Sequence, residues 1–236
     1  MASSDDSVVG GAVLGSLARG AGDEWSDLDI MFAVRDGQSV SEVLDDWTAP
    51  LARDFGATRL FDFPSGVAVY RVFLLPDSLE LDLSMTPASE FRPTGPSFSL
   101  LFGEAATTSD VPDTSIEELF GYAVHHAFHA RACIERGRSW QAEYWISALR
   151  DHILHIACQR RGLGGNYGRG FDELPRDVLD ACHLALVRSL EAAELRRALS
   201  EGVALLVRES AGVVGTVEQL KPQLGELTQA QGSGRV

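Results

Sequence analysis

The sequence predicts an α+β protein in which an N-terminal mixed β-sheet precedes a C-terminal bundle of α-helices. The first half alternates short β-rich runs with one amphipathic helix, whereas most of the second half has apolar residues at helical spacing. Between the halves, residues 86–113 contain four prolines among serines, threonines and glycines, which indicates a domain boundary. We therefore expect domains at residues 1–110 and 111–228, followed by a disordered polar tail at 229–236.

The N-terminal region is expected to form five strands and one long helix. Leu44, Trp47 and Leu51 recur at steps of three and four residues, which predicts an amphipathic helix with Ser41 as its N-cap. A shorter helix is expected to begin at Ser16. Since only one long helix interrupts the β-rich runs, a mixed sheet with helices on one side is favoured. The expected strands are residues 7–14, 27–34, 57–63, 67–75 and 79–85.

The second half is expected to be helical almost throughout. Ser115 and Glu118 form a capping-box pattern that predicts a helix reaching about residue 136. Further helices are expected over residues 140–161, 177–190, 193–209 and 213–227.

The composition is that of a globular protein, with 236 residues, 45% apolar side chains and 23% charged side chains. No apolar run approaches the roughly 20 residues of a membrane span, and no signal-peptide pattern is present. Cys133, Cys158 and Cys182 are odd in number and widely spaced, so we expect buried free thiols in a cytoplasmic protein.

The formal net charge of −14 is concentrated in the first half of the chain. Residues 1–110 contain 18 acidic and 6 basic side chains, a net charge of −12. Such a surface repels phosphate backbones, so a long nucleic acid is not expected as a partner. Divalent metals and cationic small molecules are attracted instead.

The most informative stretch is GSLARGAGDEWSDLDI, from Gly15 to Ile30. A Gly-Ser pair directly after a strand and before a helix exposes backbone N–H groups, an arrangement that binds phosphate. Asp27 and Asp29 lie two residues apart on the next expected strand, so their carboxylates point to one face. Two hard oxygen ligands on a rigid strand suit Mg²⁺ when substrate phosphates supply the remaining positions.

A third carboxylate is needed for a two-metal site or as a base. The later strand LELDLS, residues 79–84, supplies Asp82 and, on the same face, Glu80.

These residues resemble the signature of the DNA polymerase β superfamily of nucleotidyltransferases. The resemblance rests on GSLARG at 15–20 with Glu24, Ser26, Asp27 and Asp29 after it, and on Asp82 in a later strand. An acidic core followed by a helical half is similar to the adenylyltransferases that modify aminoglycoside and lincosamide antibiotics. The helical half matches more loosely, mainly over residues 140–162.

The resemblance implies a role for each matched residue. Gly15 and Ser16 would hold the β- and γ-phosphates of the nucleotide, and Asp27 and Asp29 would ligate Mg²⁺. Asp82 would ligate the second metal, take the proton from the acceptor hydroxyl, or both.

Several roles stay open at the level of sequence. Arg19 either reaches the triphosphate or pairs with an acidic neighbour, and Ser26 either binds phosphate or caps its own loop. Glu80, on the strand of Asp82, and Glu143, in the helical half, are alternative catalytic carboxylates.

The function expected from the resemblance is Mg²⁺-dependent transfer of a nucleoside monophosphate, AMP from ATP, to a hydroxyl of a small molecule. An aminoglycoside or lincosamide antibiotic is the expected acceptor, and the acidic first half favours a cationic one. The alternatives are a nucleotidyltransferase of the antitoxin type acting on protein or RNA, and a non-catalytic nucleotide-binding module. A homodimer is compatible with the large helical half.

Five of the six histidines lie between His125 and His155. His125 and His129 have the four-residue spacing of helical metal ligands. The His-Glu-x-x-His pattern is absent, and we expect these side chains to be core or interface histidines.

Overall fold

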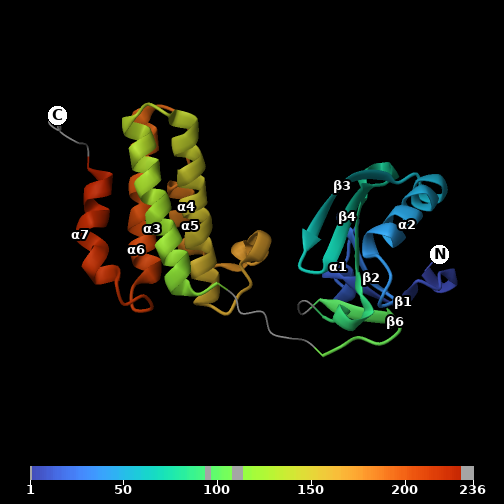
Figure 1. Cartoon of the computed structure of the whole chain (residues 1–236). Coiled ribbons are helices and arrows are strands. Elements are labelled where there is room, and N and C mark those ends of the chain that lie inside the picture. Colours follow the sequence, from blue (N-terminus) through green and yellow to red (C-terminus); the bar gives the residue numbers. More distant parts are fainter. Residues whose placement is uncertain (1, 94–96, 108–113, 230–236) are drawn as a thin grey trace. The chain divides into compact units, whose positions relative to one another are not determined.

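The computed structural model describes residues 2–93, 97–107 and 114–229 (Figure 1). The chain divides into two compact units, Met1–Val111 and Pro112–Val236. The described strands all lie in the first unit, and the second is helical, so the predicted α+β class is confirmed. Apart from Gln229, the tail expected to be disordered lies outside the described residues.

The first unit is built on a six-stranded mixed sheet with the strand order β3-β4-β5-β2-β1-β6. β2 and β5 are parallel, whereas the other neighbouring strands are antiparallel. The strands are β1 (Val8–Leu14), β2 (Leu28–Val34), β3 (Thr58–Ser65), β4 (Ala68–Leu74), β5 (Glu80–Pro87) and β6 (Phe98–Phe102).

The sequence prediction missed β6, because it assigned all of residues 86–113 to a linker. Thr86 and Pro87 complete β5, and Phe98–Phe102 pairs with β1 as an edge strand. A five-residue strand that follows several prolines and pairs only with a distant segment leaves little local signal.

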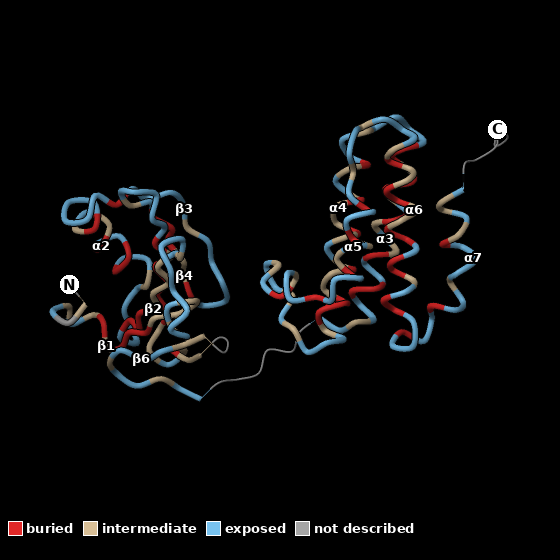
Figure 2. Tube along the Cα trace, turned by 180° about the vertical axis from the view of Figure 1, so that it is seen from behind, coloured by how far each residue is buried: buried red, intermediate tan, exposed pale blue. Residues whose placement is uncertain are grey.

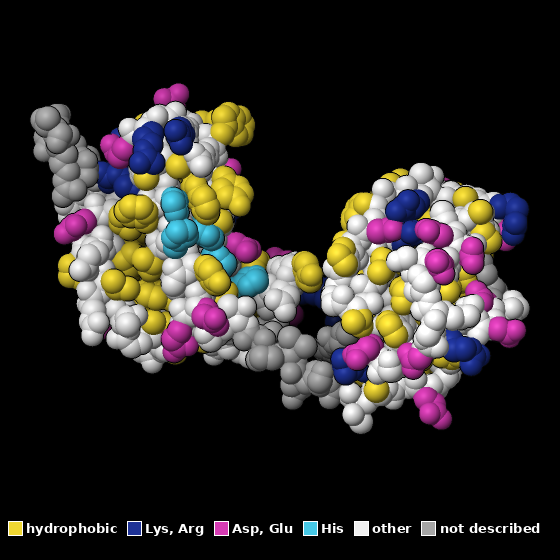
Figure 3. All heavy atoms as spheres, in the orientation of Figure 1, with side chains coloured by type: hydrophobic (Ala, Val, Ile, Leu, Met, Phe, Trp, Pro, Cys, Tyr) yellow, Lys and Arg dark blue, Asp and Glu magenta, His cyan; other side chains and the backbone are white. Residues whose placement is uncertain are grey.

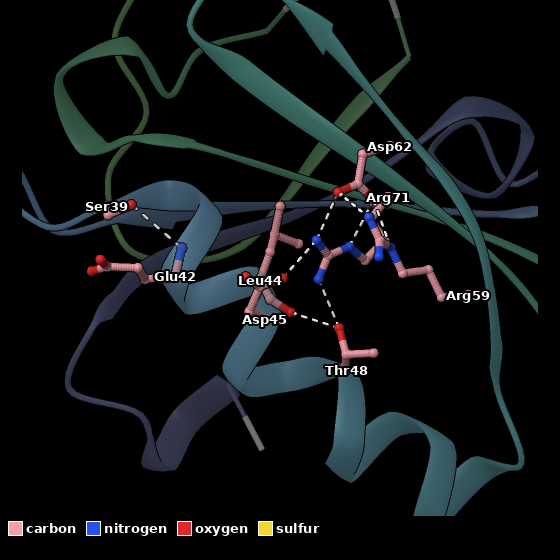
Figure 4. A network of polar contacts seen from close by, with 8 residues as sticks. All are labelled: Ser39, Glu42, Leu44, Asp45, Thr48, Arg59, Asp62 and Arg71. Carbon is pink, nitrogen blue, oxygen red and sulfur yellow. Dashed lines mark hydrogen bonds and ion pairs between the residues drawn. The ribbon is translucent and has the colours of Figure 1, made fainter.

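Helix α2 (Val40–Phe55) covers one face of the sheet. Its apolar side packs Leu44 and Trp47 against sheet residues such as Phe73 and Leu83. The N-cap is Ser39 and not Ser41: Ser39 has an extended backbone, and its hydroxyl accepts from the Glu42 N–H at 3.4 Å (Figure 4). Ser41 belongs to the first turn of the helix, where its backbone is already helical.

A buried arginine joins α2 to the strands β3 and β4 (Figure 4). Arg71 on β4 is only 3% exposed and forms ion pairs with Asp62 on β3 at 2.7 Å and Asp45 on α2 at 2.9 Å. It also donates to the Thr48 hydroxyl at 2.7 Å. Hydrogen bonds from Arg71, and to a lesser extent from Arg59, lower the pKa of Asp62 to about 2.

Side chains alternate between the two faces of the sheet. On β2 and β5, Phe32 and Leu83 point into the core beneath α2. Asp29 and Asp82 occupy the alternate positions, so they lie on the face away from α2. The short helix α1 (Gly15–Ala18) follows β1 directly.

The second unit has its own apolar core, visible in Figure 2 as buried stretches along α3, α4 and α6. The predicted capping box of Ser115 and Glu118 is confirmed. The helices are α3 (Ile116–Glu135), α4 (Ser139–Gln159), α5 (Arg176–Leu184), α6 (Ala192–Ser210) and α7 (Val217–Thr228). Short 3₁₀ turns occupy Ala2–Ser4, Pro76–Ser78, Ala88–Glu90, Asn166–Gly168 and Phe171–Glu173.

Two helices of this unit differ from their predicted ranges. α5 ends at Leu184 and does not reach residue 190, because the Arg197 guanidinium binds the carbonyls of Leu184 and Leu186 and holds the chain in a turn. α7 begins at Val217, since residues 211–216 form turns after α6.

Cys133, Cys158 and Cys182 are buried free thiols, as expected. Among the described residues, no helix has the length and apolar character needed to cross a membrane.

Candidate metal and nucleotide site

Three carboxylates converge at one end of the strands β2 and β5. Asp29 and Asp82 are directly opposite one another in the parallel register, and Asp27 lies one residue before β2 begins. One carboxylate oxygen from each residue lies within 4.8 Å of the other two. Asp27 is exposed, whereas Asp29 and Asp82 are half-buried. The structure therefore brings together all three predicted metal ligands.

This arrangement places uncompensated negative charge at Asp82. Burial raises the pKa of Asp82 to about 6, and the neighbouring charges of Glu80, Asp29 and Asp27 add to the shift. One of its carboxylate oxygens is buried and has no hydrogen-bond partner among the described residues. A divalent cation at this point would neutralise the repulsion and supply the missing partner.

Gly15 brings the backbone of the loop up to the carboxylates. Its φ of +63° lies in the left-handed region that favours glycine. A Cβ atom at this position would overlap the Oδ2 atom of Asp29. Glycine therefore avoids both the strained backbone and the displacement of the Asp29 side chain that a Cβ atom would cause.

The next residue, Ser16, has a hydroxyl that is buried and has no partner among the described residues. A buried polar atom without a partner is costly, and a bound anion at this point would remove the cost. The residues present thus fit a nucleotide phosphate beside a Mg²⁺ ion held by Asp27, Asp29 and Asp82.

Arg19 and Ser26, the other predicted nucleotide-binding residues, both have protein partners. Arg19 is exposed and donates to the Ser97 hydroxyl at 2.8 Å, and not to Asp23 or Glu24. Ser26 donates to an Asp23 carboxylate oxygen at 3.0 Å and accepts from the Asp23 N–H at 3.0 Å. The Ser26 hydroxyl therefore closes its own loop, which is the alternative role considered for it.

The two alternative catalytic carboxylates lie in different units. Glu80 is exposed at the start of β5. It lies two residues before Asp82, on the same face of the strand, and its charge helps to raise the pKa of Asp82. Glu143 lies on α4, where the Ser147 hydroxyl donates to its Oε1 atom at 2.6 Å. Of the two, only Glu80 belongs to the same unit as the carboxylate cluster and lies beside it.

The histidines of the helical unit form a band flanked by hydrophobic side chains (Figure 3). His125 and His129 pack edge to face with ring centroids 4.3 Å apart, and His129 stacks on Trp145. In the part of the chain that the structure describes, the only group of three or more possible metal ligands is the aspartate cluster. His125 is exposed and His129 is half-buried, so neither is a core residue, and their place in an interface stays a prediction.

Sequence reasoning missed two parts of this neighbourhood. Ser97, the partner of Arg19, lies in the segment interpreted as a linker. Phe61 and Phe63 lie on β3 and are 53% and 39% exposed. Their alternation with Asp62 in the sequence is a signal that both point to one face.

No protein-family model matches the chain, and no curated protein matches it. Among solved structures, it is similar to an aminoglycoside 6-adenyltransferase from Bacillus subtilis, with 14% sequence identity and a TM-score of 0.42. The match covers 97% of this chain and 95% of the other. A TM-score below 0.5 does not establish a common fold.

Proposed function

We propose that the protein is a Mg²⁺-dependent nucleotidyltransferase that transfers a nucleoside monophosphate, AMP from ATP, to a hydroxyl of a small molecule. The observation that carries the proposal is the convergence of Asp27, Asp29 and Asp82 beside Gly15, where a Cβ atom would displace the Asp29 carboxylate. Acidic clusters are common on protein surfaces. An acidic cluster that adjoins a buried, unpartnered serine hydroxyl is a more specific arrangement.

Each residue has a distinct task in this proposal. Gly15 and Ser16 bind and orient the phosphates that leave as pyrophosphate, and Asp27 and Asp29 hold the metal. Asp82 accepts the proton of the attacking hydroxyl or completes the metal site, and Glu80 and Glu143 are the alternatives for the proton. When bound, Mg²⁺ supplies charge neutralisation along the triphosphate.

The proposed acceptor is an antibiotic of the aminoglycoside or lincosamide class, and a cationic compound is favoured. The support is the net charge of −12 over residues 1–110, which also argues against a long nucleic acid as substrate.

The test is pyrophosphate release by the full-length protein with MgCl₂, each nucleoside triphosphate in turn, and a panel of kanamycin, streptomycin, spectinomycin and lincomycin. Release that requires a panel compound supports the proposal. Release that requires a protein or RNA acceptor would support the antitoxin-type alternative. Tight MgATP binding without any turnover would indicate a nucleotide-binding module.

Three variants make the assay specific to the site. Asp27→Asn and Asp29→Asn should each lower turnover by at least 100-fold, because each replaces a carboxylate that is proposed to bind Mg²⁺. Asp46→Asn is the matched control, since Asp46 is an exposed aspartate on α2 and lies away from the cluster. If both site variants keep wild-type turnover, the metal-site assignment is wrong.

A further inference from the structure

The sheet face that holds the carboxylates also carries exposed apolar side chains on its outer strands. Phe61, Phe63 and Leu74 are 53%, 39% and 42% exposed. Phe63 is held in place by Tyr70, whose ring stacks on it with centroids 4.8 Å apart and an interplanar angle of 11°. Exposed aromatic side chains that are fixed in one orientation are typical of binding surfaces and are costly to leave in water.

The register of the strands shows that these side chains lie on the same face of the sheet as the carboxylate cluster. Arg71 and Phe73 of β4 point to the α2 side, so Val72 points to the opposite side. Across the sheet, Val72 is opposite Phe61 on β3 and opposite Asp82 on β5. Asp82 is in turn opposite Asp29 on β2. One transverse row therefore leads from the carboxylates to Phe61, a separation of two strand spacings, or about 10 Å, from Asp82.

The loop at Gly15 and Ser16 and the phenylalanines of β3 lie on opposite sides of the carboxylate cluster. Gly15 and Ser16 follow β1, which neighbours β2, whereas β4 and β3 lie beyond β5. In nucleotidyl transfer the attacking and leaving oxygens are roughly in line through the α-phosphorus. Since the pyrophosphate is held on the β1 side, the attacking hydroxyl approaches from the side of β5 and β4. The acceptor thus lies beyond Asp82 toward β4 and β3. Val72 itself is buried, so the contact surface there is formed by the exposed side chains of Phe61, Phe63 and Leu74.

The charge of this surface favours a cationic acceptor. Glu80 is opposite Leu74 in the register and shares its face, so an exposed carboxylate borders the apolar side chains. Aromatic faces also attract cations within about 6 Å of the ring centroid. The surface therefore combines ring-stacking groups with negative charge.

We infer that Phe61, Phe63 and Leu74 form the acceptor subsite, which we call the β3 platform, and that it binds a hydroxyl-bearing ring compound with an apolar ring face and a cationic group. This inference rests on the proposed function. The platform is a specificity element: it holds the ring of the acceptor while the carboxylate cluster holds the nucleotide.

The test compares three variants of the full-length protein with wild type. Phe61→Ala/Phe63→Ala removes the platform, and Phe61→Tyr/Phe63→Tyr keeps its rings. Phe55→Ala is the matched control, because Phe55 is a phenylalanine of similar exposure, 56%, on α2, at the other face of the sheet. MgATP binding is measured by calorimetry, and KM and kcat are measured by pyrophosphate release with kanamycin, streptomycin, spectinomycin and lincomycin as the acceptor probes.

We expect the double alanine variant to raise the KM of at least one probe by about tenfold, with a smaller change in kcat and an unchanged affinity for MgATP. The tyrosine variant and Phe55→Ala should stay within about threefold of wild type. Unchanged MgATP affinity also shows that the double alanine variant is folded.

The inference is overturned if the wild-type protein turns over at least one probe but no KM depends on the platform, or if Phe55→Ala has the same effect as the double variant. Failure of the proposed function has a different signature, because the wild-type protein would then release no pyrophosphate with any of the probes, whether or not it binds MgATP.

Discussion

At the scale of single residues, Gly15 is the position at which the loop and the metal site depend on one another. Two constraints coincide there. The backbone is left-handed, and the Asp29 carboxylate occupies the space that a Cβ atom would need. Gly20 shares the first constraint, with a φ of +68°, but has no atom within 4 Å of an added Cβ. Substitutions at the two glycines therefore allow the effect of backbone strain to be distinguished from the effect on the metal site.

We expect Gly15→Ala and Gly20→Ala each to lower the free energy of unfolding by about 1 kcal/mol, because both force a Cβ into the left-handed region. Only Gly15→Ala should also weaken Mg²⁺-dependent nucleotide binding, by more than tenfold, since it displaces Asp29. Denaturant unfolding and calorimetric titration with MgATP measure the two effects. Equal nucleotide affinity in both variants would show that the loop does not position the carboxylate.

Asp82 is a second residue at which stability and function oppose one another. Because its folded pKa of about 6 is above the usual value of 3.8, its ionised form destabilises the metal-free protein. This cost is absent below pH 4 and is complete above pH 6.

Asp82→Asn should therefore raise the free energy of unfolding at pH 7.5 by about 2 kcal/mol in the absence of Mg²⁺, while activity is lost. The gain should disappear when unfolding is measured at pH 4. A variant that is less stable than wild type at pH 7.5 would show that Asp82 already has a stabilising partner.

At the scale of elements, the ion-pair network of Arg71 fixes α2 against β3 and β4 (Figure 4). Asp62 is its main acceptor, and the pKa of about 2 means that the pair stabilises the fold above pH 4. That contribution is lost as the pH falls from 4 toward 2.

We expect Asp62→Asn to cost about 3 kcal/mol of unfolding free energy at pH 7, because it leaves a buried guanidinium poorly paired. Asp54→Asn is the comparison, since the pair of Asp54 with Arg53 is exposed and should contribute little. Urea denaturation at pH 7 and pH 2.5 provides the measurement, with a smaller difference between Asp62→Asn and wild type expected at the lower pH. Equal stability of the two variants at pH 7 would show that the buried pair of Arg71 and Asp62 contributes no more than the exposed one.

At the scale of the whole molecule, each unit has its own apolar core. The carboxylate cluster lies entirely in the first unit, so the metal and the triphosphate are expected to bind there. A ligand stabilises only the cooperative unit that binds it.

In differential scanning calorimetry, MgATP at 100 times its Kd should therefore stabilise the unit that contains the sheet by about 2.7 kcal/mol. The transition of the helical unit should shift less. Equal shifts of both transitions would show that the helical unit also contacts the nucleotide, which would favour Glu143 as a participant. EDTA without added Mg²⁺ is the control and should abolish the shift.

The sequence by itself determined the α+β class, five of the six strands and the residues of the carboxylate cluster. Those features depend on local chemistry: alternation defines strands, the capping box defines the start of α3, and Asp27 and Asp29 are close because they are two residues apart. Asp82 could be predicted as a candidate ligand from its strand, but its position opposite Asp29 could not be predicted. That position depends on a parallel pairing of strands more than fifty residues apart in the sequence.

Tertiary structure alone decided the features that rest on distant contacts. Pairing with β1 turned part of an expected linker into β6, and it placed Ser97 beside Arg19. Alternation places Phe61 and Phe63 on one face, but only the order β3-β4-β5-β2 shows that this is the face of the carboxylates. The physical reason is that a strand's two faces are fixed by its own sequence, whereas its neighbours are selected by the packing of the whole sheet.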